Sequence, residues 1–270
     1  MGMSQIALQP NLTNSSRMRA LIVPREHGAW GLLLIPLISG AATALFQARH
    51  WTPLGLFTLA AVALFWLRTP LESSLGAAPM RVQSNAEVNV SLAAVAALGS
   101  VAFICIAVLL WGGDNLGLLA IGGTAALAFL AQSLLKQVGR RMRMAAQLMG
   151  AIGLTSTAAG AYYVVTGHLD TRAAALWIAN WIFAGDQIHY VQLRIHSAHA
   201  VSWAEKFQRG RTFFFGQFVV VGILVVGWRL HLLPGLAVLA FVPVLMRGLL
   251  WYAQGPRPLA VRRLIGLCRL

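Results

Sequence analysis

The chain of 270 residues is 58% hydrophobic and 10% charged, which excludes an ordinary soluble domain, in which about 25% of residues are charged. Its formal net charge of +14 does not indicate nucleic acid as a partner, because the basic residues alternate with apolar stretches instead of forming one patch. Apolar stretches long enough to cross a bilayer recur along the whole sequence. We therefore expect an all-α, polytopic membrane protein, since backbone groups in lipid must bond within helices.

The apolar pattern predicts eight transmembrane helices in one membrane domain over residues 25–253. A cytoplasmic tail is expected before it, over residues 1–24, and a basic cytoplasmic tail after it, over residues 254–270. The predicted helices cover residues 27–46, 52–68, 89–111, 116–136, 144–166, 172–193, 212–228 and 231–252.

The distribution of Lys and Arg predicts how these helices are oriented. One side of the membrane receives 18 of these residues and the other side receives 3. The positive-inside rule then places both termini in the cytoplasm. The cytoplasmic connections 69–88 and 194–211 are longer and more polar than the outer ones, so we expect the functional face to be cytoplasmic.

The entry to the first predicted helix packs three ionisable residues together, Arg25, Glu26 and His27. The stretch VPREHGAWG also holds glycines that allow close contact between helices. One interpretation is a plain interfacial anchor, and the other is the entrance to a ligand site. We include all three side chains among the candidate ligand-binding residues.

The cytoplasmic connection 69–88 follows the second predicted helix and carries the next candidates. Arg68 and Glu72 are four residues apart and would pair on a helix, but Pro70 is expected to end that helix. A structural ion pair or a lid-like segment is the favoured interpretation. Asn85 and Glu87 close the segment as candidate ligand-binding and catalytic residues.

The turn before the fifth predicted helix is rich in cations. Lys136, Arg140, Arg141 and Arg143 surround Gly139 in the stretch KQVGRRMRMAAQ. These charges agree with the positive-inside rule alone. They also suit a phosphate clamp, because Arg binds phosphate through a planar fork and Lys as a point charge.

The sixth predicted helix holds the only carboxylate expected inside a span, Asp186. It lies about 10 Å from the helix end at 1.5 Å per residue, a depth at which an acid has to be paired or hydrated. His189, three residues later, falls on the same face. Gln192 and Arg194 add polar groups near the cytoplasmic end. A buried polar pair that holds helices together is the structural alternative to a functional cavity.

The opening PREHGAWGLLLIPLISG resembles the start of the YwiC-like family of bacterial membrane proteins. The wider organisation resembles the UbiA-type intramembrane prenyltransferases, through LLKQVGRRMRMAAQLMG and then AYYVVTG. It also resembles their motif W-x-x-A-Y-D-x-x-Y-A-x-x-D, since Trp181, Ala184 and Asp186 match. His189 takes the tyrosine position, and Leu193 stands where the last acid belongs.

This second resemblance implies a UbiA-like fold and a magnesium-bound prenyl diphosphate. Asp186 would be a metal ligand, with Glu72 or Glu87 in support of the first acidic motif, which is absent from this sequence. Mg²⁺ prefers several oxygens in octahedral geometry, and one deep acid with scattered glutamates is a poor site for it. The resemblance therefore supports the fold more than the reaction.

Three functions remain open. The first is a prenyltransferase-like enzyme in the bacterial inner membrane, with Asp186, His189, Glu72 and Glu87 as catalytic candidates and an isoprenoid diphosphate as ligand. The second is a non-catalytic binder of a lipid, quinone or tetrapyrrole. The third is a transporter in which Asp186 and His189 relay protons. All three assume an inward-opening chamber lined by Asp186 and the arginine-rich turn.

Overall fold

The computed structural model describes residues 14–24, 27–45, 51–74, 82, 84–112, 116–197, 200, 202–233 and 235–254. These residues form helices and turns and contain no strand, which confirms the all-α prediction. The chain divides into two compact units. One unit comprises residues 1–27 and 55–111, and the other comprises residues 28–54 and 112–270. The single membrane domain with two tails stays a prediction.

The first unit contains α1 (Asn14–Ile22), most of α3 (Thr52–Ser74) and α4 (Asn85–Trp111). α1 is a helix within a segment that the sequence analysis treated as tail. Its end is tied to α3 by the indole of Trp66, which donates a hydrogen bond of 2.9 Å to the Ile22 carbonyl. This bond explains why a short polar segment is held as a helix beside a membrane helix.

The helix α3 continues through Pro70, so the predicted break there is wrong. Pro70 is fully buried inside α3, and its carbonyl accepts a hydrogen bond of 2.9 Å from the Ser91 hydroxyl on α4. Proline is more frequent within membrane helices than within soluble ones. Because the turn stays helical, Arg68 Nε and Glu72 Oε1 form an ion pair at 2.9 Å.

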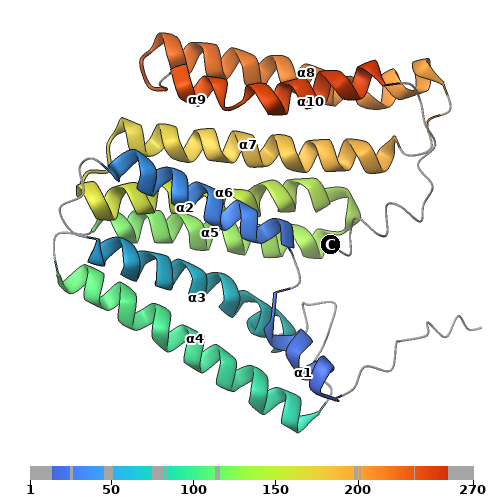
Figure 1. Cartoon of the computed structure of the whole chain (residues 1–270). Helices are drawn as coiled ribbons and strands as arrows, with labels where there is room; N and C mark the ends of the chain where they lie inside the picture. The colour runs from blue at the N-terminus through green and yellow to red at the C-terminus, as the bar shows by residue number, and fades with distance from the viewer. Residues whose placement is uncertain are drawn as a thin grey trace, which may run out of the picture. The chain divides into compact units, whose positions relative to one another are not determined.

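The second unit is a row of helices. In Figure 1, α5 (Gly117–Val138), α6 (Arg143–Thr166), α7 (Thr171–His196) and α8 (Trp203–Arg229) lie side by side in chain order. The short helix η2 (Arg140–Met142) connects α5 to α6. α2 (His27–Ala44) runs along α6, where Thr157 Oγ1 donates to the Leu33 carbonyl at 3.1 Å. α9 (Gly235–Leu239) and α10 (Val242–Ala253) return along α8.

The last predicted helix, 231–252, is wrong as a single element. The structure has α9 and α10 separated by a turn at Ala240 and Phe241. Pro243 stands in the first turn of α10, where its missing N–H costs no helical hydrogen bond. Continuous hydrophobicity hid this break in the sequence, although the proline is a recognised sign of a helix start.

The core of the second unit is centred on α6. Every residue from Thr155 to Val164 is buried, and most of them are small. Small side chains let backbones approach closely, the usual way in which membrane helices pack. At Gly40 of α2 an added Cβ would lie 2.1 Å from the Ala158 carbonyl oxygen, so only glycine fits this crossing.

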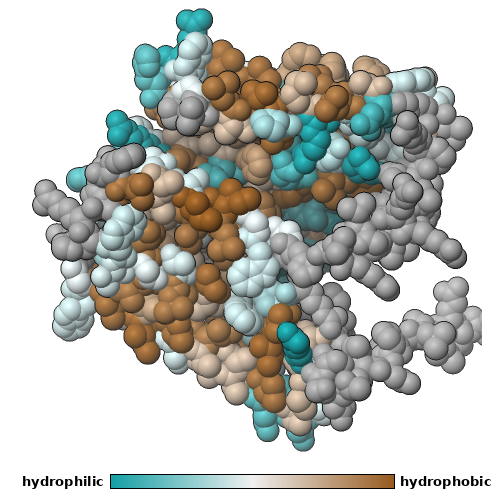
Figure 2. Space-filling view, in the orientation of Figure 1, coloured by the Kyte–Doolittle hydropathy of each residue, from teal (hydrophilic) through white to brown (hydrophobic). Residues whose placement is uncertain are grey.

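Among the residues that the structure describes, five helices are long and apolar enough to cross a membrane, namely α3, α4, α5, α6 and α8. Their exteriors carry large apolar side chains, such as Phe103 and Phe215, that are more than half exposed. Hydrophobic residues also gather over much of the face drawn in Figure 2. These features support a multi-pass membrane protein. α7, with Asp186, is not among the five, and the apolar segments Gly28–Ala44 and Ala237–Ala253 are shorter.

Candidate functional site

Asp186 lies on the face of α7 that turns toward α8 and α10. Its side chain is 2% exposed and pairs with Arg247 of α10 at 3.4 Å. Gln217 of α8 donates a hydrogen bond to its other carboxylate oxygen. Burying an acid without partners in a membrane protein is costly, so these two contacts explain how the sequence tolerates Asp186. Both partners lie far away along the chain, and the sequence analysis missed them.

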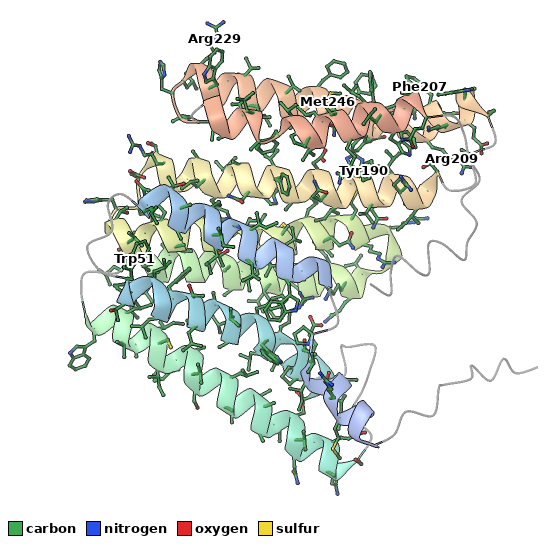
Figure 3. All side chains as sticks on the ribbon, viewed as in Figure 1. Trp51, Tyr190, Phe207, Arg209, Arg229 and Met246 are labelled. Carbon is green, nitrogen blue, oxygen red and sulfur yellow. The ribbon has the colours of Figure 1, made fainter. Side chains whose placement is uncertain are left out.

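Arg247 connects two faces of α7. One guanidinium nitrogen contacts Asp186, and the other donates to the Gln187 side-chain oxygen at 2.7 Å. Its guanidinium carbon lies 3.9 Å from the centre of the Tyr190 ring, a cation–π distance. Figure 3 labels Tyr190 on α7, the helix that lies next to α8 and α10. Arg247 is one of the 18 Lys and Arg residues that the charge distribution places on the cytoplasmic side, and its side chain holds α10 against α7.

His189 follows Asp186 on the same face, as the spacing predicted, but its described ring contact is aromatic. The imidazole meets the Phe213 ring edge-on, with centroids 5.3 Å apart and planes 78° apart. Arg194, one turn beyond Tyr190, donates a long hydrogen bond of 3.4 Å to the Tyr190 hydroxyl. These contacts give both predicted residues a packing role. Their predicted catalytic and ligand-binding roles stay predictions.

The donors around Asp186 do not fit a magnesium ion. The carboxylate already faces a guanidinium and an amide N–H, whereas Mg²⁺ requires a near-octahedral set of oxygens. Within the described residues, no three His, Cys, Asp or Glu side chains gather in a group that could hold a metal. We therefore derive no step through a metal at Asp186, and its predicted metal role stays a prediction.

The arginine-rich turn between α5 and α6 lies at the surface. Lys136 at the end of α5 is exposed, as are Arg141 and Arg143, and Gly139 adopts a positive φ of 118°. The side chain of Arg140 lies outside the described residues. Arg141 and Asp186 do not share any of the described pockets, so the predicted common chamber stays a prediction.

Further predicted residues belong to the first unit. Glu87 is buried at the start of α4, and Asn85, two residues earlier, is exposed. Arg68 and Glu72 form the ion pair within α3 described above. Arg25, Glu26 and the His27 side chain lie outside the described residues, so their predicted roles at the entrance stay predictions.

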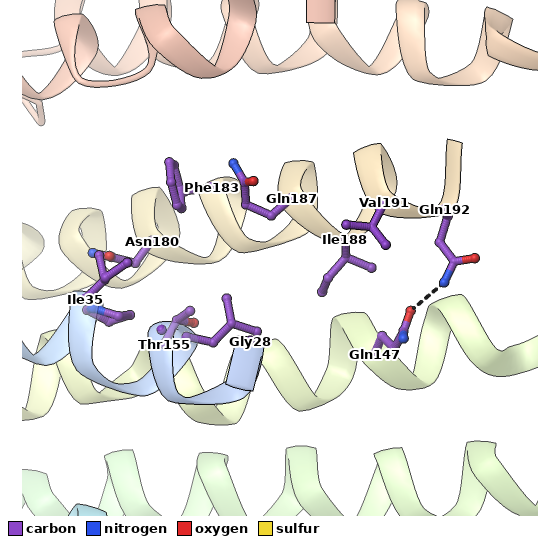
Figure 4. Close-up of a pocket in the computed structure, with 13 residues that line it drawn as sticks. Gly28, Ile35, Gln147, Thr155, Asn180, Phe183, Gln187, Ile188, Val191 and Gln192 are labelled. Atoms are coloured by element: carbon purple, nitrogen blue, oxygen red, sulfur yellow. Dashed lines mark hydrogen bonds between the residues drawn. The ribbon is translucent and has the colours of Figure 1, made fainter. Parts of the chain in front are cut away.

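A pocket of about 460 Å³ opens between α2, α6 and α7. Figure 4 shows the side chains that line it, from Gly28 and Ile35 on α2 across Gln147 on α6 to Phe183 on α7. The described residues that line it include no ionisable side chain. The polar members are Gln147, Thr155, Asn180, Gln187 and Gln192. Of the residues predicted from sequence, this pocket contains Gln192.

Two features give this pocket hydrogen-bonding capacity. Gln192 donates to Gln147 at 3.1 Å, the dashed line in Figure 4, and this bond uses only part of the capacity of two amides. On α2, Pro36 has no N–H, so the Leu32 carbonyl one turn earlier lacks its helical partner. Leu32 and Pro36 both line the pocket. The site thus combines apolar walls with neutral donors and acceptors.

These pocket residues have only weak signals in the sequence. Gln147 is the last residue of the arginine-rich stretch, and its uncharged amide carries no sign of a binding role there. Gln187 stands beside Asp186 and reaches both the pocket and Arg247. Along α7, Asn180 and Gln187 are seven residues apart and therefore share a face, whereas Gln192, five residues further on, does not continue that spacing.

Comparison with known proteins gives one match. Residues 23–163 match the protein family described as YwiC-like protein. No curated protein and no solved structure matches the chain. The matched region contains α2 and most of α6, which supply the part of the pocket lining that lies opposite α7.

Proposed function

Because the chain belongs to the YwiC-like family, and because its pocket is apolar with neutral polar groups, we propose that it binds an uncharged lipophilic molecule within the membrane. The ligand would carry a carbonyl or hydroxyl head, as a quinone or a neutral lipid does. Ligand sites of this kind are mostly apolar, with a few placed polar groups that fix orientation.

The lining of the α2–α6–α7 pocket carries this proposal. Its walls are isoleucine, leucine, valine and phenylalanine side chains. Three glutamines in the lining add side-chain amides that can form hydrogen bonds. A diphosphate would require cations, and the described lining offers none. A carbonyl or hydroxyl head instead suits the Gln147–Gln192 pair, because each amide can both donate and accept.

The proposal includes the arrangement in the membrane. We infer eight crossing segments, comprising the five apolar helices, α2, α7, and α9 with α10 taken together. An even number keeps both termini on one side, which the distribution of Lys and Arg assigns to the cytoplasm. The bacterial inner membrane is the location proposed from the YwiC-like family.

The test is to purify the full chain and identify co-purifying lipophilic molecules by mass spectrometry. We expect a neutral lipophilic molecule whose occupancy is unchanged when EDTA is present throughout the preparation. Gln147→Leu and Gln192→Leu are each expected to lower occupancy about five- to tenfold, the effect of losing one hydrogen bond of about 1–1.5 kcal/mol.

Gln137→Leu is the matched control, because Gln137 is exposed at the end of α5 and does not line the pocket. It should retain the occupancy of the unchanged protein. If no lipophilic molecule co-purifies, or if both pocket variants retain it in full, the proposed function is wrong.

A prenyltransferase-like activity is the second candidate. It is favoured by the exposed cations Lys136, Arg141 and Arg143 around η2, which suit a diphosphate headgroup. Purified protein would be mixed with isoprenyl diphosphates, Mg²⁺ and aromatic acceptors, and diphosphate release measured. Release that disappears in Arg141→Gln would establish this activity, and the absence of both release and diphosphate binding would remove it.

A further inference from the structure

A second and larger pocket, of about 800 Å³, lies around the first half of α7. We name it the Arg172 pocket. It is formed by α2, α7, the turn after α8, and the α9–α10 segment. Its polar members are Ser39, Thr43, Arg172, Asn180 and His231, and Trp228 lines it as well. It shares Ile35, Asn180 and Phe183 with the α2–α6–α7 pocket, but the proposed function makes no use of Arg172 or His231.

The arginine and the phenylalanine pair of the Arg172 pocket are separated along α7. Arg172 stands in the first turn of α7, whereas Phe183 comes eleven residues later, or about 16 Å further along the helix. Phe241 packs edge-on against Phe183 there, with ring centroids 6.0 Å apart. The pocket therefore has a cationic end at the start of α7 and an aromatic, apolar end within the helix row.

His231 reaches this pocket from a strained backbone position. In the turn after α8, the His231 N–H donates to the Trp228 carbonyl and the Leu232 N–H to the Gly227 carbonyl, the pattern of a Schellman motif. His231 occupies the left-handed position of that motif with φ 56°, where glycine is the usual residue. The chain thus carries an imidazole at a position where glycine would be less strained.

The acid nearest to Arg172 in sequence is already engaged. Asp170 caps α7 by accepting hydrogen bonds of 3.0 Å from the backbone N–H groups of Arg172 and Ala173. The Tyr162 hydroxyl donates to its other oxygen at 3.2 Å. The carboxylate is thus held by helix capping, and no ion pair between it and the Arg172 guanidinium is seen in the described part of the chain.

We propose that the Arg172 pocket binds a membrane lipid with an anionic headgroup. The Arg172 guanidinium and the His231 imidazole hold the phosphate, and an acyl chain lies toward Phe183 and Phe241. Arginine and histidine donors match phosphate oxygens, and the apolar depth suits a chain rather than a free ion. The distribution of Lys and Arg places this end of α7 on the outer side, so the ligand would come from the outer leaflet.

Arg229 provides a matched control for this proposal. It lies two residues before His231, at the end of α8, and carries the same charge as Arg172. In Figure 3 its side chain points away from α7, and it does not line the Arg172 pocket. A lipid attracted only by surface charge would depend on both arginines, whereas a lipid bound in the pocket depends on Arg172.

The experiment measures binding of phosphatidylglycerol to the detergent-purified full chain by native mass spectrometry, with phosphatidylcholine as the neutral comparison. Arg172→Gln should lower the affinity for phosphatidylglycerol about fivefold, the effect of one cation near a lipid headgroup. Arg229→Gln should change it less than twofold. Affinity for phosphatidylcholine should be the same in all variants.

His231→Gly separates binding from folding. Because glycine relieves the left-handed strain, this variant should unfold in lipid-free detergent about 2 °C higher than the unchanged protein. It should nevertheless bind phosphatidylglycerol more weakly, by a few-fold. A variant that gains stability and loses the lipid cannot be explained by misfolding.

Three results would overturn the proposal. The first is unchanged phosphatidylglycerol affinity in Arg172→Gln and His231→Gly. The second is an equal loss in Arg229→Gln, which would indicate surface charge alone. The third is that inorganic phosphate displaces the lipid completely at millimolar concentration, which would make the occupant a free anion. None of these results depends on the neutral ligand proposed for the α2–α6–α7 pocket.

Discussion

The two sides of α7 are held by different physical means. On the α6 side, packing is close, and α6 presents a continuous buried run of small residues. The indoles of Trp177 and Trp181 donate to the carbonyls of Ile152 and Leu148, at 3.0 and 3.2 Å. Close packing and two indole hydrogen bonds therefore hold α6 against α7.

On the α8 and α10 side, packing is sparser and polar contacts are more prominent. Asp186 pairs with Arg247 and Gln217, and Arg247 stacks on Tyr190. Two buried polar atoms in this cluster, Gln217 Oε1 and Arg247 Nε, have no hydrogen-bond partner within the described residues. Buried polar atoms without hydrogen-bond partners cost stability. α8 and α10 are therefore held against α7 less firmly than α6 is.

The largest predicted effect breaks the close-packed side. Gly40→Ala should lower the free energy of unfolding by about 3 kcal/mol, because the new Cβ would lie 2.1 Å from a backbone oxygen of Ala158. Thermal unfolding of the purified protein measures it. Gly31→Ala on the same helix is the control, since a Cβ added there would lie 4.0 Å from its nearest neighbour, Cδ1 of Ile35. Equal stability of the two variants would contradict the tight crossing.

The second prediction concerns the looser side. Arg247→Gln should lower the free energy of unfolding by about 2 kcal/mol, because it leaves the Asp186 carboxylate, which is 2% exposed, without its cation. Asp186→Asn should cost about 1 kcal/mol, since the remaining Arg247 side chain is 36% exposed. The double variant should be more stable than the sum of the two losses implies. Strict additivity in a double-mutant cycle would show that the two side chains do not interact.

A smaller effect is expected from the indole bonds. Trp177→Phe should lower the free energy of unfolding by about 1 kcal/mol, as it removes one hydrogen bond and some contact area. Trp111→Phe is the comparison, because Trp111 is 95% exposed at the end of α4. Unfolding curves that shift equally for both substitutions would argue against the α6–α7 bond.

The smallest effect concerns an ion pair at the surface. Glu205 and Arg209, one turn apart on α8, form a pair in which both side chains are more than one-third exposed. Glu205→Gln should change the free energy of unfolding by less than about 0.5 kcal/mol, because water screens such pairs. A loss as large as that of Arg247→Gln would mean that the exposed Glu205–Arg209 pair stabilises the protein as much as the buried Asp186–Arg247 pair does.

Helix positions were largely predictable from the sequence, because apolar stretches of membrane length must become helices. The errors arose where the outcome depends on a neighbour. Pro70 stays within α3, where it is fully buried and where the Ser91 hydroxyl of α4 bonds its carbonyl, and no local pattern contains that contact. The break before α10 was visible in principle at Pro243, but the uniform hydrophobicity around it favoured one helix.

The candidate site was less predictable than the fold. Asp186 was singled out correctly as a buried acid, and local spacing suggested His189 as its companion. The cation that pairs with it, Arg247, lies 61 residues away and had been counted as an interfacial charge. The pocket amides Gln147 and Gln187 carry no charge, so rules that weigh ionisable groups passed over them.

The reliance of Asp186 on Arg247 has a consequence for how the protein is made. In the proposed arrangement of eight crossing segments, α7 reaches the bilayer before the ribosome has produced α10, because synthesis proceeds from the N-terminus. During that interval the acid lacks its guanidinium and costs about 3 kcal/mol in an inserted helix. We therefore expect α7 to enter the membrane stably only when α10 follows it. Chains truncated after α8 should be degraded.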